Sequence, residues 1–186
     1  SDLAGSAIFT PILEGSSIYA AGRDGTVLRL EAATGKPIWR VNVGAQLSGG
    51  VGASASLIAV GTSEGEVIAL EAPTGNIRWR ANVSSEVLAA PVVLNDAVLA
   101  RSADSRVFSL DNVDGRRRWV YQRAIPALTI RSSAGLVVQD NLAFVGFAGG
   151  RMVALSLLNG GLRWDIAVAQ PKGATELERV ADVSGN

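Results

Sequence analysis

The sequence contains neither cysteine nor histidine in its 186 residues. Without a thiol or an imidazole, the chain cannot build a Cys/His zinc site, a cysteine nucleophile or a hydrolytic triad based on histidine. The lack of cysteine fits a reducing compartment and also an oxidising one in which stray thiols are avoided, so it does not identify the compartment. Together, the two absences exclude most familiar enzyme chemistry.

The chain also has no excess charge of either sign and no long apolar run. Seventeen Lys and Arg residues balance seventeen Asp and Glu residues, which argues against nucleic acid or an anionic membrane surface as a partner. There is no run of about 18 apolar residues and no signal segment at the start. The chain does not begin with Met, so we interpret it as a processed or trimmed piece. We expect membrane attachment only through a lipid anchor that this chain lacks.

What the chain does contain is a repeat marked by its four tryptophans. Each tryptophan closes the same phrase: an apolar residue, two residues, Leu, four residues, Gly, three residues and Trp. The four copies are Val27-Leu30-Gly35-Trp39, Val67-Leu70-Gly75-Trp79, Val107-Leu110-Gly115-Trp119 and Met152-Leu155-Gly160-Trp164, at intervals of 40, 40 and 45 residues. A period near 40 with a turn glycine and a docking tryptophan is typical of β-propeller blades. We therefore predict an all-β fold of four four-stranded antiparallel blades, which form a partial ring.

The predicted blades cover residues 5–44, 45–84, 85–123 and 132–169, with interblade loops at 124–131 and 170–186. Within the second blade we expect strands at 57–61, 67–71 and 77–83. The innermost strands are predicted at 7–13, 51–56, 90–94 and 136–139. These runs lack polar alternation, so we expect them to be buried on both faces.

Glycine and tryptophan have defined places in the predicted blade. A turn glycine precedes each tryptophan by four residues, and a second turn falls upstream at Gly25, Gly65, Ser105 and Gly150. Both turns favour a positive φ angle, which is unfavourable for a residue with a Cβ atom. All four tryptophans are expected to be buried between neighbouring sheets, and none is assigned to cofactor stacking.

Two kinds of segment resemble known proteins. The phrase at residues 33–39 resembles the repeat of quinoprotein dehydrogenase-like propellers, a superfamily that also contains non-enzymes. Residues 125–131 and 173–183 lie outside the generic repeat and resemble the BamB family, the lipoprotein propellers of the outer-membrane β-barrel assembly machinery (BAM complex). The resemblance implies about half of an eight-bladed ring. It also implies a noncatalytic scaffold, without a cofactor, at the periplasmic face of the outer membrane of a Gram-negative bacterium, lipid-anchored in the full-length protein.

The same resemblance implies the partner and the residues that contact it. In the family, these two loops bind the periplasmic domains of BamA, which transfers partner binding to Leu128, Ile130 and Arg131 in the first loop and to Asp182 in the second. A second carboxylate that the family carries two residues after Asp182 is Ser184 here. Nascent outer-membrane proteins, pairing with sheet edges, are the other implied partner. No catalytic, cofactor-binding or metal-binding residue is assigned.

The loops can also be interpreted from their residues. The interval before Trp164 is five residues longer than the others, and the excess falls in the apolar segment 124–130. Leu128 and Ile130 either cover the edge of their own blade or form an exposed apolar anchor beside Arg131, as in a protein-binding hot spot. Residues 175–178 fit a helix capping box. Equivalent connections emerge on one face of a propeller, so both loops are expected to form one surface.

Several features are assigned to structure and not to ligand binding. Arg116, Arg117 and Arg118 are predicted to lie on a solvated outer strand, because Asp111 and Asp114 are close in sequence. The Asp24-Gly25 and Asp104-Ser105 pairs are predicted to form turns, not metal loops.

Two other functions share the predicted fold. A quinone-dependent dehydrogenase fragment would need a metal-held quinone, an acidic base and stacking side chains, but the sequence has neither an adjacent cysteine pair nor carboxylates recurring on the inner strands. A periplasmic sensor or adhesion propeller is the third alternative.

The ends of a four-blade array form a separate problem. Each end leaves an apolar sheet face uncovered, so we expect self-association of two copies into eight blades; a compact open half-ring is the alternative.

Overall fold

The computed structural model describes residues 8–123 and 135–168, which form sixteen strands and no helix. The first sheet contains β1 (Ile12–Glu14), β2 (Ser17–Ala21), β3 (Thr26–Glu31) and β4 (Pro37–Asn42). The second contains β5 (Leu47–Ala53), β6 (Leu57–Thr62), β7 (Glu66–Glu71) and β8 (Ile77–Asn82). The third contains β9 (Val92–Val93), β10 (Ala97–Arg101), β11 (Arg106–Asp111) and β12 (Arg117–Gln122). The fourth contains β13 (Leu136–Gln139), β14 (Leu142–Phe147), β15 (Arg151–Ser156) and β16 (Leu162–Ala167).

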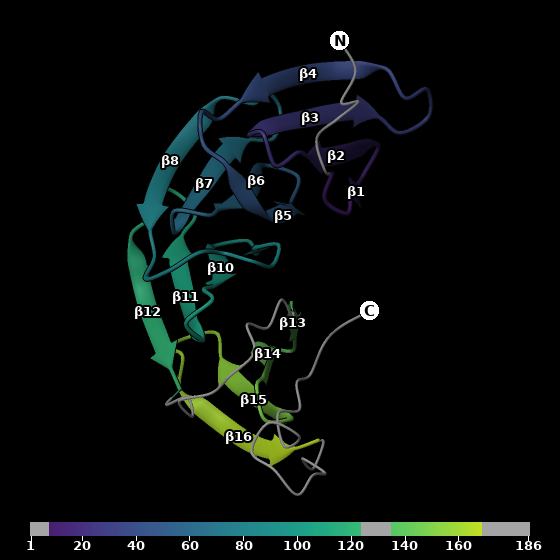
Figure 1. The fold of residues 1–186 in the computed structure, drawn as a ribbon. Helices are drawn as coiled ribbons and strands as arrows, with labels where there is room; N and C mark the ends of the chain where they lie inside the picture. Colours follow the sequence, from purple (N-terminus) through teal and green to yellow (C-terminus); the bar gives the residue numbers. More distant parts are fainter. Residues whose placement is uncertain (1–7, 124–134, 169–186) are drawn as a thin grey trace, which may run out of the picture.

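The four sheets are consecutive antiparallel blades arranged in an open arc. In each blade the strands pair in sequence order, from an inner to an outer strand. The inner strands β5 and β13 face the hollow of the arc, and the outer strands β4, β8, β12 and β16 follow its convex rim (Figure 1). The predicted all-β architecture of four four-stranded blades is confirmed. No helix in the part described is long and apolar enough to cross a membrane.

Glycines form the turns where the repeat places them. The four turn glycines that precede the tryptophans have φ between 69° and 75°. At the upstream turns, Gly25, Gly65 and Gly150 have positive φ, and Ser105 adopts a φ of 62° without being glycine. The third blade thus keeps the turn geometry with a residue that carries a Cβ atom, at a conformational cost that the other three blades avoid.

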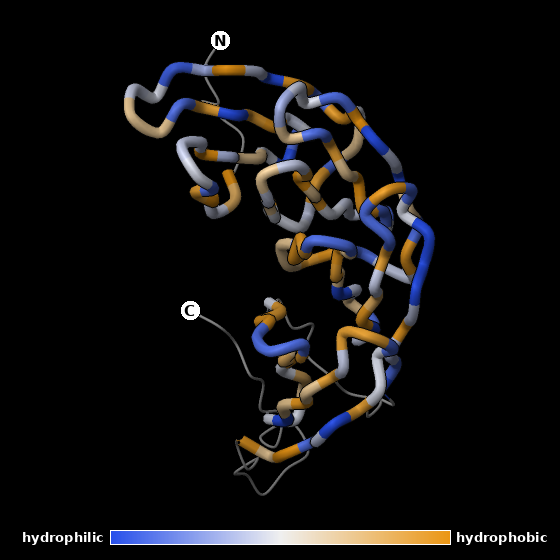
Figure 2. Tube along the Cα trace, turned by 180° about the vertical axis from the view of Figure 1, so that it is seen from behind, coloured by the Kyte–Doolittle hydropathy of each residue, from blue (hydrophilic) through white to orange (hydrophobic). Residues whose placement is uncertain are grey.

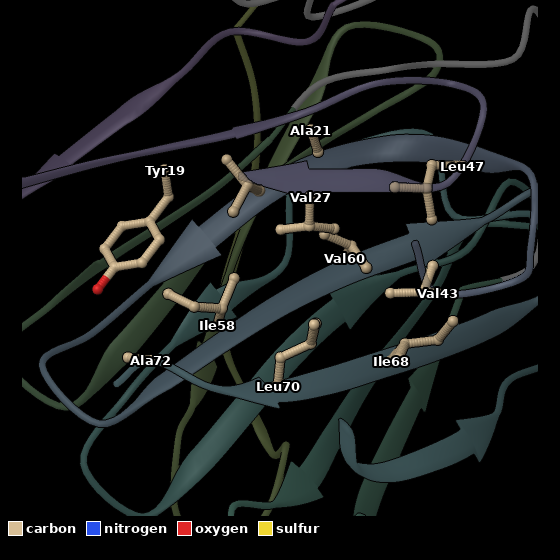
Figure 3. Close-up of a cluster of buried hydrophobic side chains, with 11 residues drawn as sticks. Tyr19, Ala21, Val27, Val43, Leu47, Ile58, Val60, Ile68, Leu70 and Ala72 are labelled. Carbon is tan, nitrogen blue, oxygen red and sulfur yellow. The ribbon is translucent and has the colours of Figure 1, made fainter. Parts of the chain in front are cut away.

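The hydrophobic core consists of one cluster at each junction between blades. At the first junction, Tyr19 and Val27 of the first blade pack against Ile58, Ile68 and Leu70 of the second (Figure 3). Ile58, Ile68 and Leu70 are fully buried. Equivalent clusters join the second blade to the third and the third to the fourth. The fold is therefore stabilised by repeated blade contacts and not by a single central core.

The prediction for the inner strands is only partly right. The inner strand β13 has the predicted bounds, but β5 lies at 47–53 instead of 51–56, and β1 and β9 are shorter than expected. β5 is largely buried as predicted, whereas burial on both faces is wrong for β1, β9 and β13. These strands line the open hollow, where Leu13 and Val137 are 65% and 64% exposed.

In the second and third blades the middle strands are the ones buried on both faces, because they have strand partners on both edges and a neighbouring blade on each face. All six residues of β6 are buried. Along the chain, hydrophobic residues alternate with hydrophilic ones on the outer strands (Figure 2).

The predicted burial of the four tryptophans is also only partly right. Trp79 and Trp119 are buried as predicted, with 7% and 8% of their surface exposed, and Trp39 is half-buried. Trp164 is 36% exposed, so the prediction that it is buried is wrong. The reason is geometric: each of the other three rings is covered by the next blade, and no blade follows Trp164 within the residues described.

Candidate partner-binding surface

On one face of the arc, the chain passes from the outer strand of one blade to the next blade. These connections begin at Val43, Val83, Arg123 and Val168. We call this side of the arc the connection face. On this face, in the first, second and fourth blades, a backbone hydrogen bond joins the start of the connection to the upstream turn of the same blade. The backbone N–H of Val43 donates to the carbonyl of Gly25 at 2.9 Å, and Val83 donates in the same way to Gly65 at 2.8 Å. In the fourth blade, Val168 N–H donates to Gly150 at 2.8 Å.

A charged cluster joins the third and fourth blades on the connection face. Arg123 follows β12 and is the last described residue before segment 124–134. Its guanidinium donates to Asp165 of β16 at 2.5 Å, and Nε of Arg151 donates to the other carboxylate oxygen at 2.9 Å. The side chains of Arg123 and Asp165 are only 25% and 23% exposed. The single carboxylate thus holds two arginines and fixes the start of the first loop to the fourth blade.

The ring of Phe147 packs against the arginines near this cluster. Phe147 at the end of β14 is 1% exposed. The guanidinium carbons of Arg101 and Arg123 lie 5.2 Å and 5.9 Å from its ring centroid, and the ring of Tyr121 is 6.1 Å away. At these distances the ring face attracts cations. The arrangement helps to orient Arg123 toward Asp165.

The environment of Asp165 lowers the pKa of its carboxyl. Burial by itself raises this pKa, but hydrogen bonds and the positive charges of Arg123 and Arg151 outweigh that effect. Because the folded-state pKa is below the unfolded value, the stabilisation is complete above about pH 4 and is lost as the pH falls through the folded-state value.

Replacing Asp165 with Asn should lower the free energy of unfolding by about 1–2 kcal/mol at neutral pH, because two arginines lose a charged acceptor. Urea unfolding of both proteins between pH 3 and pH 7 measures the difference, which should shrink as the pH falls below about 4, because the carboxyl of the unfolded chain then binds a proton while the native carboxyl, with its lowered pKa, stays ionised. As a control, Asp114→Asn removes an exposed pair with Arg116, whose side chain is 87% exposed, and should change stability by about 0–1 kcal/mol. A difference for Asp165→Asn that does not vary with pH would contradict this role of the carboxylate.

All four predicted partner-binding residues lie outside the described residues. They are Leu128, Ile130 and Arg131 in the first loop and Asp182 in the second. The structure describes the residues next to them: Arg123 leads into segment 124–134, and Val168 leads into segment 169–186. Both lie on the connection face, and Arg123 contacts Asp165, three residues before Val168. That the two loops form one surface stays a prediction.

The sequence interpretation missed Arg123, Arg151, Asp165 and Phe147. One signal was present in the repeat: the residue after the tryptophan is Asp165 only in the fourth copy. The acidic residue at this position marks the blade that receives an arginine from its neighbour.

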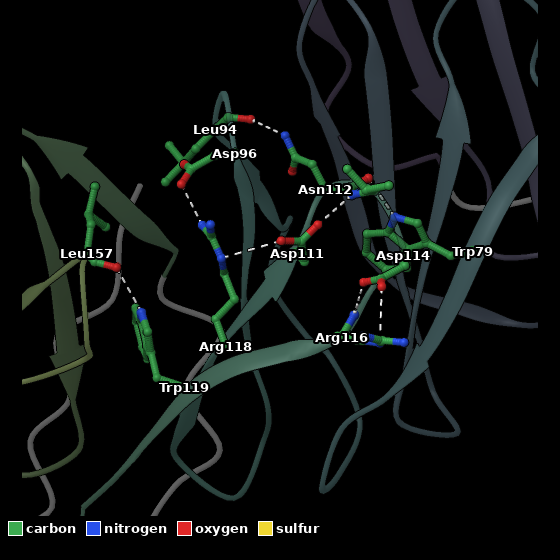
Figure 4. Close-up of polar contacts among 11 residues, drawn as sticks. Trp79, Leu94, Asp96, Asp111, Asn112, Asp114, Arg116, Arg118, Trp119 and Leu157 are labelled. Atoms are coloured by element: carbon green, nitrogen blue, oxygen red, sulfur yellow. Dashed lines mark hydrogen bonds and ion pairs between the residues drawn. The ribbon is translucent and has the colours of Figure 1, made fainter.

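Two of the three consecutive arginines, Arg116 and Arg118, pair with nearby carboxylates. Arg116 pairs with Asp114 at 3.1 Å, and Arg118 pairs with Asp96 at 2.5 Å and Asp111 at 3.5 Å (Figure 4). All three arginines are exposed, so this strand is the solvated outer surface that the sequence indicated.

The Asp24 and Asp104 turns are also confirmed as turns. Asp24 accepts hydrogen bonds from the backbone N–H of Thr26 at 3.1 Å and from its hydroxyl at 3.0 Å. The backbone bond is the largest cause of the lowered pKa of Asp24. Asp104 pairs with Arg106 at 3.1 Å. Asp24 is used within its own turn, whereas Asp104 also accepts a hydrogen bond from the hydroxyl of Ser84 at 2.9 Å.

The hollow of the arc contains an apolar cavity of about 430 Å³. Its lining comes from the inner strands and includes Phe9, Ile12, Val51 and Pro91, but no charged side chain. Across residues 8–123 and 135–168, no three carboxylates gather where they could hold a metal ion. The residues present therefore do not fit a metal-held quinone, which requires oxygen ligands for the ion and an acidic base.

Comparisons with known proteins agree with this description of the fold. The family model described as outer membrane protein assembly factor BamB matches residues 23–186, a range that includes both loops. A relative with that name from Pseudomonas aeruginosa is 56% identical over 178 residues, covering 96% of this chain and 47% of the relative. The crystal structure of BamB from Moraxella catarrhalis has a TM-score of 0.87 at 28% identity, covering 95% of this chain and 54% of that chain.

The fold is shared more widely than the family. A quinohemoprotein alcohol dehydrogenase from Comamonas testosteroni has a TM-score of 0.70 at 18% identity, covering 84% of this chain and 34% of that chain; at this identity the likeness shows the fold alone. The present chain spans about half the length of the relatives it matches. Since the family model covers both the blades and the off-repeat loops, the chain belongs to the outer membrane protein assembly factor BamB family.

Proposed function

We propose that the chain is part of a noncatalytic scaffold subunit of the outer-membrane protein assembly machinery, which binds the periplasmic domains of BamA. The observation that carries the proposal is the family match, because it runs through both off-repeat loops and not only through the blades. The proposed place of action is the periplasmic face of the outer membrane, with a lipid anchor in the longer protein.

The described part of the connection face supports loop-mediated binding. Arg123 and Val168 each lead into one of the two loops, and the ion pair between Arg123 and Asp165 connects their surroundings. Fixing these two positions to each other lowers the entropy lost when a partner binds between them. In the proposed interface, Leu128 and Ile130 supply apolar contacts beside Arg131, and Asp182 supplies a charge from the second loop.

The proposal assigns no reaction to the chain. The cavity in the hollow has an apolar lining, and the sequence has no histidine or cysteine. Both observations support a binding role over a dehydrogenase role.

The sheet edges give less support to direct contact with nascent barrel strands. Outer strands carry exposed arginines, such as Arg78 and Arg80 on β8 and Arg117 on β12, and charge on an edge discourages the addition of another strand. The inner strand β9 has only two residues. We therefore base the proposal on the loops.

Replacing Arg131 with Glu should weaken binding to the periplasmic domains of BamA by at least about tenfold, because a central charge of the proposed hot spot is reversed. Surface plasmon resonance with immobilised BamA periplasmic domains measures the dissociation constant. Arg117→Glu is the matched control, since it makes the same charge change at an exposed position of the outer strand β12. Equal effects of the two variants, or no binding by the unmodified chain, would refute the proposed surface.

A further inference from the structure

An ion pair at the outer edge of the first junction connects two blades. Arg80 of β8 donates from Nη1 to Glu66 of β7 at 3.2 Å and from Nη2 to the backbone carbonyl of Val43, where the connection from the first blade begins. Glu66 and Arg80 occupy diagonal positions of neighbouring antiparallel strands, which is close enough for long side chains to meet. One ion pair within the second blade thus reaches back to the blade before it.

The third junction has the same arrangement with the charges exchanged. The two positions of that ion pair are taken in the fourth blade by Arg151 and Asp165, which form a hydrogen bond at 2.9 Å. The residue that starts the connection from the third blade is Arg123, and its guanidinium reaches Asp165 across the junction. At both junctions, therefore, a basic and an acidic side chain meet on neighbouring outer strands, and one of them contacts the preceding blade.

The second junction has no acidic side chain at these positions. Its equivalent residues are Arg106 on β11, Val120 on β12 and Val83 at the start of the connection. Val120 carries no charge and is 43% exposed. Among the described residues, Arg106 forms an ion pair only with Asp104, in the turn of its own blade, at 3.1 Å. The third blade thus keeps the arginine that Arg151 supplies in the fourth blade, without the carboxylate beside it.

A pocket lies where the other two junctions have their bridging side chains. Its volume is about 280 Å³, and it is formed by residues at the end of β8 and on β11 and β12. The strands β8 and β12 follow one another along the convex rim (Figure 1). Val83, Phe108 and Val120 form an apolar wall of this pocket, so it can accept a side chain that has an apolar stem.

The polar groups of the pocket match a carboxylate. Arg106 is in register with Gln122 at the end of β12, and Asn82 at the end of β8 adds a second side-chain amide. The other charged residue of the described lining, Arg117, is at the opposite end of β12. Both charges in this lining are therefore positive. A guanidinium presents paired N–H donors to a carboxylate, and amide N–H groups can donate to the same oxygens.

We propose that this pocket binds a glutamate side chain from an acidic segment of a protein partner. The carboxylate pairs with Arg106, as Asp165 pairs with Arg151 in the fourth blade, and the two methylene groups pack on Val83 and Val120. Charge complementarity favours this occupant, because an acidic side chain stands beside the basic one at the other two junctions. The inference goes beyond the proposed function, since the pocket is formed by the blades and not by the two loops.

Nuclear magnetic resonance titration of the full chain with a short peptide tests this inference. The probe is the peptide Gly-Glu-Glu-Gly, acetylated and amidated so that only its side chains are charged, and Gly-Gln-Gln-Gly is the matched peptide. The glutamate peptide should shift the Nε–H resonance of Arg106 and the side-chain amide resonances of Asn82 and Gln122. The glutamine peptide should bind at least about tenfold more weakly, because it lacks the charge.

Two substitutions test whether Arg106 holds the carboxylate. Arg106→Gln removes the positive charge, and Val120→Asp places a carboxylate at the position that Asp165 has in the fourth blade, where it competes with the peptide. Each should weaken binding of the glutamate peptide by at least about tenfold. Val120→Asn matches the size of the aspartate and should weaken binding less. Arg163→Gln removes an exposed arginine of β16 and should leave binding unchanged.

Three results would each overturn the inference. They are equal binding of the two peptides, tighter binding of inorganic phosphate than of the glutamate peptide, and unchanged binding by Val120→Asp. The dispersion of each variant's spectrum establishes that it is folded. Because the peptide contains no BamA sequence and these variants leave both loops intact, the outcome is separate from the effect of Arg131→Glu on BamA binding.

Discussion

Replacing Trp79 with alanine should lower the free energy of unfolding by about 3–5 kcal/mol, the range for deleting a large aromatic side chain from a core. Trp79 is 7% exposed and lies in the cluster between the second and third blades. The substitution empties that junction and removes the donor that satisfies the carbonyl of Asn112. Urea unfolding, followed by circular dichroism, gives the free energy.

The matched control is Trp164→Ala. Trp164 has the same position in its repeat but is 36% exposed and contacts Phe144 without a following blade. Its loss should lower the free energy of unfolding by only about 1 kcal/mol, because an aromatic pair contributes about that much beyond its buried area. Equal losses for the two variants would mean that burial by the next blade is not what makes the tryptophan stabilising.

Replacing Gly115 with alanine should lower the free energy of unfolding by about 3 kcal/mol, from positive-φ strain together with overpacking against a ring. The residue has a φ of 73°, and the new methyl group would lie 2.6 Å from Cε3 of Trp79. The ring is confined in the junction, so the turn or the blade must shift. Chemical unfolding provides the measurement.

Gly35→Ala isolates the contribution of the ring. Gly35 has nearly the same φ, 70°, but a methyl group there has no neighbour within 4 Å. Its substitution should lower the free energy of unfolding by only about 1 kcal/mol, because only backbone strain is added. The difference between the two glycine variants measures the contact with tryptophan; a difference near zero would contradict the docking geometry.

Much of the blade structure could be predicted from the sequence because its determinants are local and repeated. The spacing from glycine to tryptophan placed the hairpin turns, and Gly25, Gly65 and Gly150 have the positive φ that the turns require. The second blade was predicted closely: its strands β6, β7 and β8 begin and end within one residue of the predicted bounds. The off-repeat segments indicated the BamB family, which the family match over residues 23–186 confirms.

The burial of each strand and tryptophan depended on neighbours that a repeat pattern does not specify. Trp79 and Trp164 close the same phrase, yet one is buried and the other is exposed, because burial requires a following blade. Similarly, β13 was placed correctly but its burial was not, since an inner strand of an open arc borders the hollow on one side.

By itself, the sequence determined the repeat, the four blades and the family, since turn preferences, strand patterns and off-repeat similarity are carried along the chain. Only the tertiary structure decided whether residues at the same position of the repeat also have the same surroundings. Arg123 meets Asp165 across 42 residues, and the tryptophans of equivalent repeats differ in burial, from 7% exposed at Trp79 to 36% at Trp164. These contacts depend on how one blade is placed against the next, and a free energy of burial or pairing exists only when both surfaces are in place.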